Sequence, residues 1–221
     1  MALFSKLDTL GIIRGTGIVP VFHTDDASVA KSIVKACYEG GIRAFEFTNR
    51  GDGALRVFEE LVAFVRSECP DLALGAGTIL DAPTAALYIQ AGADFVVSPG
   101  MADDTARLCN RRGIPYTPGC GTVTEILHAL EAGCDLVKLF PAGTLGGPAF
   151  VKNILGPLPR LMTLCTGAVE PDPDNLKAWA RSGATAVGMG SRLFPADTIK
   201  SGNYKAVTEL CSNCIKWFSN K

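Results

Sequence analysis

A single lysine, Lys138, lies at the centre of the apolar run Leu136 to Pro141, where a charged side chain is unexpected. Lysine is almost never fully buried, because removing an unpaired charge from water is costly. Two explanations are open. Either Lys138 lies near a strand end and extends its head group into water, or it points into a closed apolar site that keeps the amine partly neutral. A neutral amine is a nucleophile towards ketones, so the second explanation predicts Schiff-base chemistry.

Glu46 and Arg50 are the next candidates, because they lie in and just after the predicted strand 44–48, where Phe45 and Phe47 take the alternate positions. Successive side chains of a strand point to opposite faces, so Glu46, Thr48 and Arg50 would share one face. Glu46 and Lys138 alone are compatible with a structural ion pair or with an acid/base pair. Arg50 adds a second cation, and the unmatched positive charge favours binding of a carboxylate.

Glycine-rich segments after two later strands suggest an anion site. Thr166-Gly167-Ala168 and Gly188-Met189-Gly190-Ser191 place backbone N–H groups where they can point together at a phosphate, and Ser191 adds a hydroxyl. Glycines are also ordinary turn residues, so both interpretations are open. Gly75-Ala76-Gly77 lies inside a predicted strand and indicates tight packing there.

The scaffold that must position these residues consists of eight predicted strands, each followed by a helical pattern. The strands cover 18–22, 44–48, 72–78, 95–99, 115–118, 136–140, 161–166 and 186–189. Their starts lie roughly 20 to 30 residues apart, which is the length of one βα unit. We therefore expect one domain, 1–221, folded as a (β/α)8 TIM barrel with a short N-terminal helix and a C-terminal helix. An open doubly wound sheet is the alternative.

Local signals support this division into helices and strands. Asp25 is expected to cap the helix after the first strand, Thr122 and Glu125 form a capping box, and Asp172 precedes a first-turn proline. In a barrel, reactive groups belong at the carboxyl-terminal ends of the strands, where Thr78, Pro99 and Thr166 are found.

Composition limits the partners. The chain has 221 residues, 48% of them hydrophobic, and a net charge of -1. Without a basic field we expect neither nucleic-acid binding nor membrane binding, and small solutes are the expected partners. The first ten residues lack the unbroken apolar segment of a signal peptide, and eight scattered cysteines are expected to be reduced. The sequence thus predicts a cytoplasmic protein.

Metal-dependent chemistry is a weaker alternative, because it needs several converging ligands. The chain has two histidines, His23 and His128, which are far apart in the sequence. We therefore expect no metal and no cofactor. A non-catalytic sugar-phosphate-binding barrel is a further alternative, which would explain the glycine loops without requiring Lys138 and Glu46.

Between about Gly17 and Phe194 the chain resembles the bacterial 2-keto-3-deoxy-6-phosphogluconate (KDPG) / 4-hydroxy-2-oxoglutarate (KHG) aldolase family. The segments that match are Phe45-Glu46-Phe47-Thr48-Asn49-Arg50, Gly75-Ala76-Gly77-Thr78, Ser98-Pro99-Gly100, Lys138-Leu139-Phe140-Pro141-Ala142, Thr166-Gly167 and Gly190-Ser191. The resemblance implies a metal-independent class I aldolase of the Entner–Doudoroff type of carbohydrate metabolism, and a homotrimer. Lys138 would form the Schiff base and Glu46 would be the acid/base.

The resemblance also implies a substrate-binding set and a reaction. Arg50 would hold the carboxylate, and two further groups would line the pyruvate end (Thr78, Pro99, Phe140) and the distal end or its phosphate (Thr166, Gly167, Ala168, Gly190, Ser191). The implied reaction is cleavage of KDPG to pyruvate and glyceraldehyde 3-phosphate, with KHG or another 2-keto-3-deoxy sugar acid as alternatives. Asn49-Arg50-Gly51 and Cys165-Thr166-Gly167-Ala168 replace the family's common Leu-Arg-Thr and Pro-Thr-Gly-Gly, so the aldehyde half is left open.

Overall fold

The computed structural model describes residues 1–219, so the last two residues of the expected domain lie outside the described part. Within it, nine parallel strands form one sheet in the order β5-β4-β3-β2-β1-β9-β8-β7-β6. The strands are β1 (Ile18–Phe22), β2 (Ala44–Thr48), β3 (Ala73–Gly77), β4 (Phe95–Val97), β5 (Tyr116–Thr117), β6 (Gly119–Cys120), β7 (Leu136–Leu139), β8 (Met162–Thr166) and β9 (Ala186–Met189). The helices are α1 (Lys6–Thr16), α2 (Ala27–Glu39), α3 (Ala54–Glu68), α4 (Ala82–Ala91), α5 (Asp103–Arg112), α6 (Val123–Glu131), α7 (Gly147–Leu155), α8 (Pro173–Arg181), α9 (Ala196–Lys200) and α10 (Tyr204–Ser219).

The sheet closes at Pro118, which separates β5 from β6. Proline has no backbone N–H, so it donates no ladder hydrogen bond at this position. β5 pairs with β4, and β6 pairs with β7. The carbonyl of Thr117 accepts from Ser98 N at 3.2 Å on the β4 side, and the carbonyl of Pro118 accepts from Lys138 N at 2.8 Å on the β7 side. The two short strands therefore occupy one barrel position, and the expected (β/α)8 barrel is confirmed over the open sheet.

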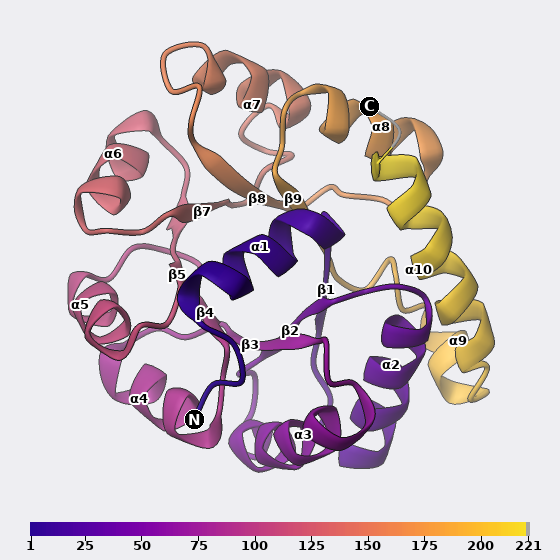
Figure 1. Cartoon of the computed structure of the whole chain (residues 1–221). Coiled ribbons are helices and arrows are strands. Elements are labelled where there is room, and N and C mark those ends of the chain that lie inside the picture. Colours follow the sequence, from indigo (N-terminus) through magenta and orange to yellow (C-terminus); the bar gives the residue numbers. More distant parts are fainter. Residues whose placement is uncertain (220–221) are drawn as a thin grey trace.

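Helix α1 crosses the amino-terminal mouth of the barrel (Figure 1). Its buried Leu10 and Ile13 pack on inward-facing residues of the strands, among them Val19, Phe95 and Leu164. The helix ends at Thr16 and is capped by Gly17, whose φ of 70° is a left-handed conformation that glycine adopts without strain. One end of the barrel is thus filled with apolar side chains, which leaves the opposite end for a ligand.

The remaining helices surround the strands, and α10 completes the ring by packing against α2 and α8 (Figure 1). Large side chains such as Phe58 and Trp179 are buried between helices and strands. Burial of each such side chain contributes about 1.5 to 3 kcal/mol. The expected N-terminal and C-terminal helices are therefore integral parts of the fold.

Most of the expected helix starts are confirmed. The capping box of Thr122 and Glu125 and the cap of Asp172 before Pro173 are present. The cap expected at Asp25 was wrong, because Asp26 is the residue whose Oδ1 accepts from Ser28 N at 2.8 Å. The short helix α9 was not predicted, since its five residues show no apolar period. No helix in residues 1–219 is long and apolar enough to cross a bilayer.

Candidate active site

Lys138 and Glu46 meet inside the barrel. The Lys138 Nζ lies 3.6 Å from Glu46 Oε1, and the exposed fractions of the two side chains are 8% and 0%. Both side chains point inward because each occupies the same alternating face of its strand as the apolar interior residues, Ala44 in β2 and Leu136 in β7. The amine is therefore buried beside a carboxylate and does not extend into bulk water.

Glycines in β3 make the space that Glu46 occupies. A Cβ atom built at Gly77 would collide with the Glu46 carboxylate, and one built at Gly75 would collide with the ring of Phe95. The packing explanation for Gly75-Ala76-Gly77 is thereby supported. A side chain at Gly77 would displace Glu46 from its place near Lys138.

The Glu46 carboxylate is unusual because it is buried without hydrogen bonds. Neither of its oxygens has a hydrogen-bond partner within residues 1–219. The 3.6 Å separation from Lys138 Nζ is an ion-pair contact but is longer than a hydrogen bond. Buried polar atoms are normally paired, and an exception calls for an explanation. Both oxygens of Glu46 are thus available to accept a proton from a group that enters the site.

A cavity of about 650 Å³ opens at the carboxyl-terminal end of the strands, above this pair. Thr48 and Phe140 line it, and they lie one inward-facing position beyond Glu46 and Lys138. The Lys138 Nζ lies 5.2 Å from the centroid of the Phe140 ring. A cavity of this size suits a small organic ligand. Lys138 and Glu46 are not among its lining residues, and Phe140 is the lining residue in contact with the amine.

The comparisons with known proteins agree with this geometry. The family model described as "Aldolase: KDPG and KHG aldolase" matches residues 10–210. The chain belongs to the KDPG and KHG aldolase family. A 2-dehydro-3-deoxy-phosphogluconate aldolase of Pseudoalteromonas atlantica is 33% identical over 210 residues, 95% of each chain. The KHG/KDPG aldolase of Escherichia coli is 30% identical over 211 residues, 96% of each chain.

A solved aldolase structure gives the same result for the fold. The KDPG aldolase of Legionella pneumophila, which holds pyruvate as a covalent carbinolamine intermediate, superposes with a TM-score of 0.83 at 28% identity. The match covers 92% of this chain and 96% of that one. The chain is therefore a lyase of the aldolase type, and its family acts through a Schiff base without a metal.

The structure gathers most of the residues expected from the aldolase resemblance. Those that line the cavity are Arg50, Phe140, Thr166, Gly167, Ala168, Gly190 and Ser191. Thr166 also has a buried hydroxyl oxygen without a partner in the described chain, so it can bond a ligand. Thr78 and Pro99 follow β3 and β4 at the same end of the barrel but do not line the cavity.

Sequence reasoning missed three cavity residues of this aldolase: His23, Glu170 and Arg192. Thr48, which was expected on the same face as Glu46 and Arg50, also lines the cavity. Arg192 Nε lies 3.4 Å from Glu170 Oε2, so the two charges offset each other at the rim. His23 directly follows β1, where the rule for barrel strands predicts functional residues. That signal was available, but a solitary histidine was judged only as a metal ligand.

Ala168 occupies a strained backbone position where the family commonly has glycine. Its φ is 58°, a left-handed conformation that costs a residue with a Cβ about 1 to 2 kcal/mol. A Cβ at Gly143 would collide with the Ala168 methyl group. Glycine at position 143 therefore makes the alanine tolerable in this aldolase.

Cysteine is not a competing nucleophile beside Lys138. Cys120 on β6 and Cys165 on β8 are in register with Leu139, the residue after Lys138, and both are buried in the cluster that holds Leu139 rather than in the barrel interior. Burial raises the pKa of each thiol to about 12, so both remain protonated at neutral pH. In the described part of the chain, no group of three or more His, Cys, Asp or Glu residues could hold a metal ion.

Proposed function

We propose that this chain cleaves a 2-keto-3-deoxy sugar acid, preferably KDPG, through a Schiff base on Lys138. The observation that carries this proposal is the buried Lys138 amine, 3.6 Å from a Glu46 carboxylate that has no hydrogen-bond partner in residues 1–219. A structural ion pair would be expected to satisfy its remaining lone pairs with hydrogen bonds. The arrangement instead suits an amine that attacks a carbonyl and a carboxylate that moves a proton.

Each step of the proposed cleavage can be assigned to one of these two residues. The Lys138 Nζ attacks the C2 carbonyl, and loss of water gives a protonated imine. Glu46 takes the proton of the C4 hydroxyl, and the C3–C4 bond electrons move into the imine as the aldehyde leaves. Glu46 returns the proton to C3 of the resulting enamine, and water releases pyruvate from Lys138.

Substrate binding is divided between the two ends of the cavity. We assign the substrate carboxylate to Arg50 and the pyruvate end to Thr78, Pro99 and Phe140. Backbone N–H groups and hydroxyls suit a phosphate, so we assign the distal end of the substrate to the residues that offer them. These residues are Thr166, Gly167, Ala168, Gly190 and Ser191. The curated relatives support this division, because several are named for a phosphogluconate substrate.

The phosphorylated acid should be preferred over KHG or an unphosphorylated sugar acid. Charge-assisted hydrogen bonds are worth about 1.5 to 3 kcal/mol each, so loss of two lowers kcat/KM by about a hundredfold or more. Pyruvate release coupled to lactate dehydrogenase measures kcat/KM for each acid. Equal values for KDPG and KHG would contradict the phosphate assignment and leave the Lys138 chemistry intact. No cleavage of any of these acids would contradict the proposed function.

We further propose that the protein is a homotrimer of the cytoplasm, with small keto acids rather than nucleic acid or membrane as partners. Three exposed apolar residues of α6, Val123, Leu127 and Leu130, recur at helical spacing on one face. Such a stripe marks an interaction surface. All eight cysteines are free thiols, as is usual in a reducing compartment.

Light scattering should give three times the chain mass of 23.2 kDa. Leu127→Glu places a charge in the stripe and should shift the mass towards the monomer. Leu7→Glu, at an exposed leucine of α1, is the matched control and should leave the mass unchanged. A monomer at micromolar concentration would rule out the trimer.

A further inference from the structure

A three-residue turn, Thr48-Asn49-Arg50, connects the two parts of the proposed site. Glu46 lies within β2, which ends at Thr48, and Arg50 lies beyond the strand at the cavity. Gly51 then reverses the chain with a φ of 109°, a conformation that residues with a Cβ rarely adopt. The location of Arg50 therefore depends on what holds this turn, since strand pairing no longer does.

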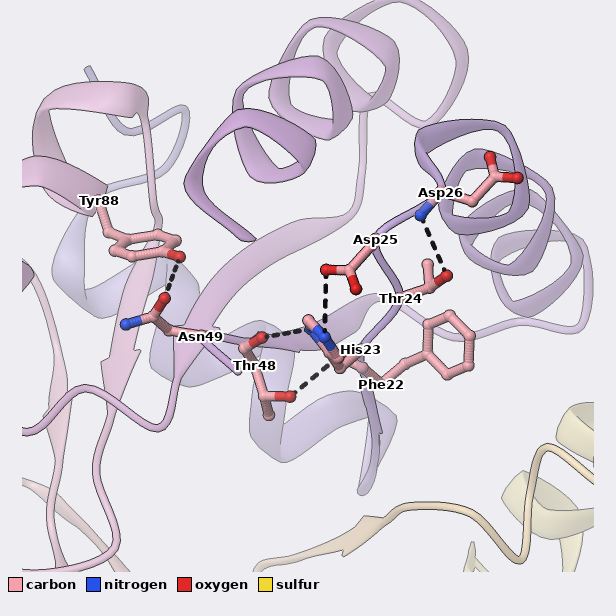
Figure 2. A network of polar contacts seen from close by, with 8 residues as sticks. All are labelled: Phe22, His23, Thr24, Asp25, Asp26, Thr48, Asn49 and Tyr88. Atoms are coloured by element: carbon pink, nitrogen blue, oxygen red, sulfur yellow. Dashed lines mark hydrogen bonds and ion pairs between the residues drawn. The ribbon is translucent and has the colours of Figure 1, made fainter. Parts of the chain in front are cut away.

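His23 holds the turn from the side of β1. Its Nδ1 lies 3.1 Å from the carbonyl oxygen of Thr48, and that oxygen also accepts from Arg50 N at 2.9 Å. A carbonyl oxygen only accepts, so Nδ1 is the donor. The Thr48 hydroxyl donates back to the Phe22 carbonyl at 3.4 Å. Figure 2 shows the contacts of Thr48 with His23 and Phe22, which link the ends of the two strands.

Tyr88 holds the turn from the opposite side. Its hydroxyl, carried by α4, donates to Asn49 Oδ1 at 2.9 Å, while Asn49 N donates to the Gly77 carbonyl at 2.8 Å. Burial raises the pKa of the Tyr88 phenol to about 12, so the hydroxyl keeps its proton at neutral pH. In Figure 2 the histidine and the tyrosine approach Thr48 and Asn49 from opposite sides.

We propose that His23 and Tyr88 are positioning residues that clamp the Thr48–Arg50 turn and so place Arg50 for the substrate carboxylate. The inference rests on the proposed role of Arg50. Asn49, the tyrosine's partner, stands where the family commonly has leucine, and a leucine side chain could not accept this hydrogen bond. The clamp acts on binding, because it holds Thr48 and Asn49, the two residues before Arg50, and leaves Lys138 and Glu46 in their strands.

Histidine variants test the clamp from the β1 side. His23→Ala should raise KM for the keto acid about fivefold, the effect of one hydrogen bond, and leave kcat within about twofold. A lesion that only destabilised the fold would lower the active fraction, and hence kcat, without raising KM. His23→Asn should recover most of the loss, because its amide nitrogen lies as many bonds from Cα as Nδ1 does. His23→Gln carries its amide one bond further and should not.

Tyrosine variants test the other side with less risk to folding. Tyr88→Phe removes only the hydroxyl and should raise KM by a similar factor of about five. Tyr38→Phe is the matched control. It removes a tyrosine hydroxyl of α2 that donates to Asp71 Oδ2 at 3.4 Å, away from the turn, and it should leave KM unchanged.

Arg50→Ala, measured in parallel, separates the clamp from the function on which it rests. If Arg50→Ala raises KM while His23→Ala and Tyr88→Phe leave it unchanged, the clamp is wrong and the role of Arg50 stands. If Arg50→Ala itself leaves KM unchanged, Arg50 does not bind the substrate carboxylate, and the positioning role of His23 and Tyr88 is then also wrong. A rise in KM for His23→Ala that asparagine and glutamine rescue equally would contradict the Nδ1 contact.

Discussion

Glu46→Gln is expected to lower kcat by about 10²- to 10⁴-fold with little change in KM. Glutamine keeps the size of the side chain but cannot accept and return a proton. Glu46 is fully buried and both its oxygens lack hydrogen-bond partners in the described residues, so no hydrogen-bonded neighbour is in place to take over its proton transfer. Steady-state pyruvate release from KDPG measures both constants.

A second variant and a second measurement separate proton transfer from other roles. Arg50→Ala should instead raise KM, because it removes the cation assigned to the substrate carboxylate. If Glu46 only stabilised Lys138 as an ion-pair partner, glutamine would lower the thermal unfolding midpoint and leave kcat per folded molecule nearly unchanged. If Glu46→Gln lowered kcat by less than about tenfold, Glu46 would not be the acid/base. If Glu46→Gln and Arg50→Ala had the same effects on kcat and KM, the two residues would not have separate roles.

The barrel was predictable from the sequence because short apolar runs, such as Ile18–Phe22 and Phe95–Val97, recur at the length of a βα unit. Pro118 was expected to end the fifth strand, but the chain continues through Gly119 and Cys120 in the same barrel position. Partners on both sides, Ser98 and Lys138, hold this position. Such pairing between distant segments leaves no local signal in the sequence.

The central pair was predictable for a similar reason. Glu46 and Lys138 lie on inward faces that a period of two assigns, and the resemblance named both. Their separation of 3.6 Å was not predictable, because it depends on the space that Gly77 leaves across β3. A glycine in a strand indicates close packing without identifying the side chain that fills the space.

Residues beyond the strand ends were the least predictable. The alternation of side chains between the two faces of a strand ends with the strand. Thr78, the first residue after β3, has a left-handed φ of 59° and is not among the residues that line the cavity. The contact of His23 with the Thr48 carbonyl was not predictable, because only the pairing of β1 with β2 brings the two residues together. Asp25 was expected to cap α2 and instead lies 3.6 Å from His23 Nε2.

Lys138→Arg is expected to abolish measurable turnover. Arginine keeps a cation near Glu46, but its guanidinium stays protonated and cannot form the imine. Lys152→Arg, at an exposed lysine of α7, is the matched control and should retain full activity. If the kcat of Lys138→Arg exceeded about 1% of the kcat of the unsubstituted protein, an imine on Lys138 would not be the electron sink of the reaction.

Borohydride reduction in the presence of pyruvate tests the central claim most directly. The hydride traps an imine as a stable secondary amine, so the reacting lysine is identified by peptide mass analysis. We predict irreversible inactivation that requires pyruvate, one adduct located on Lys138, and no adduct in Lys138→Arg. An active protein that gives no adduct, as a metal-dependent aldolase would, or an adduct on a different lysine would contradict the account.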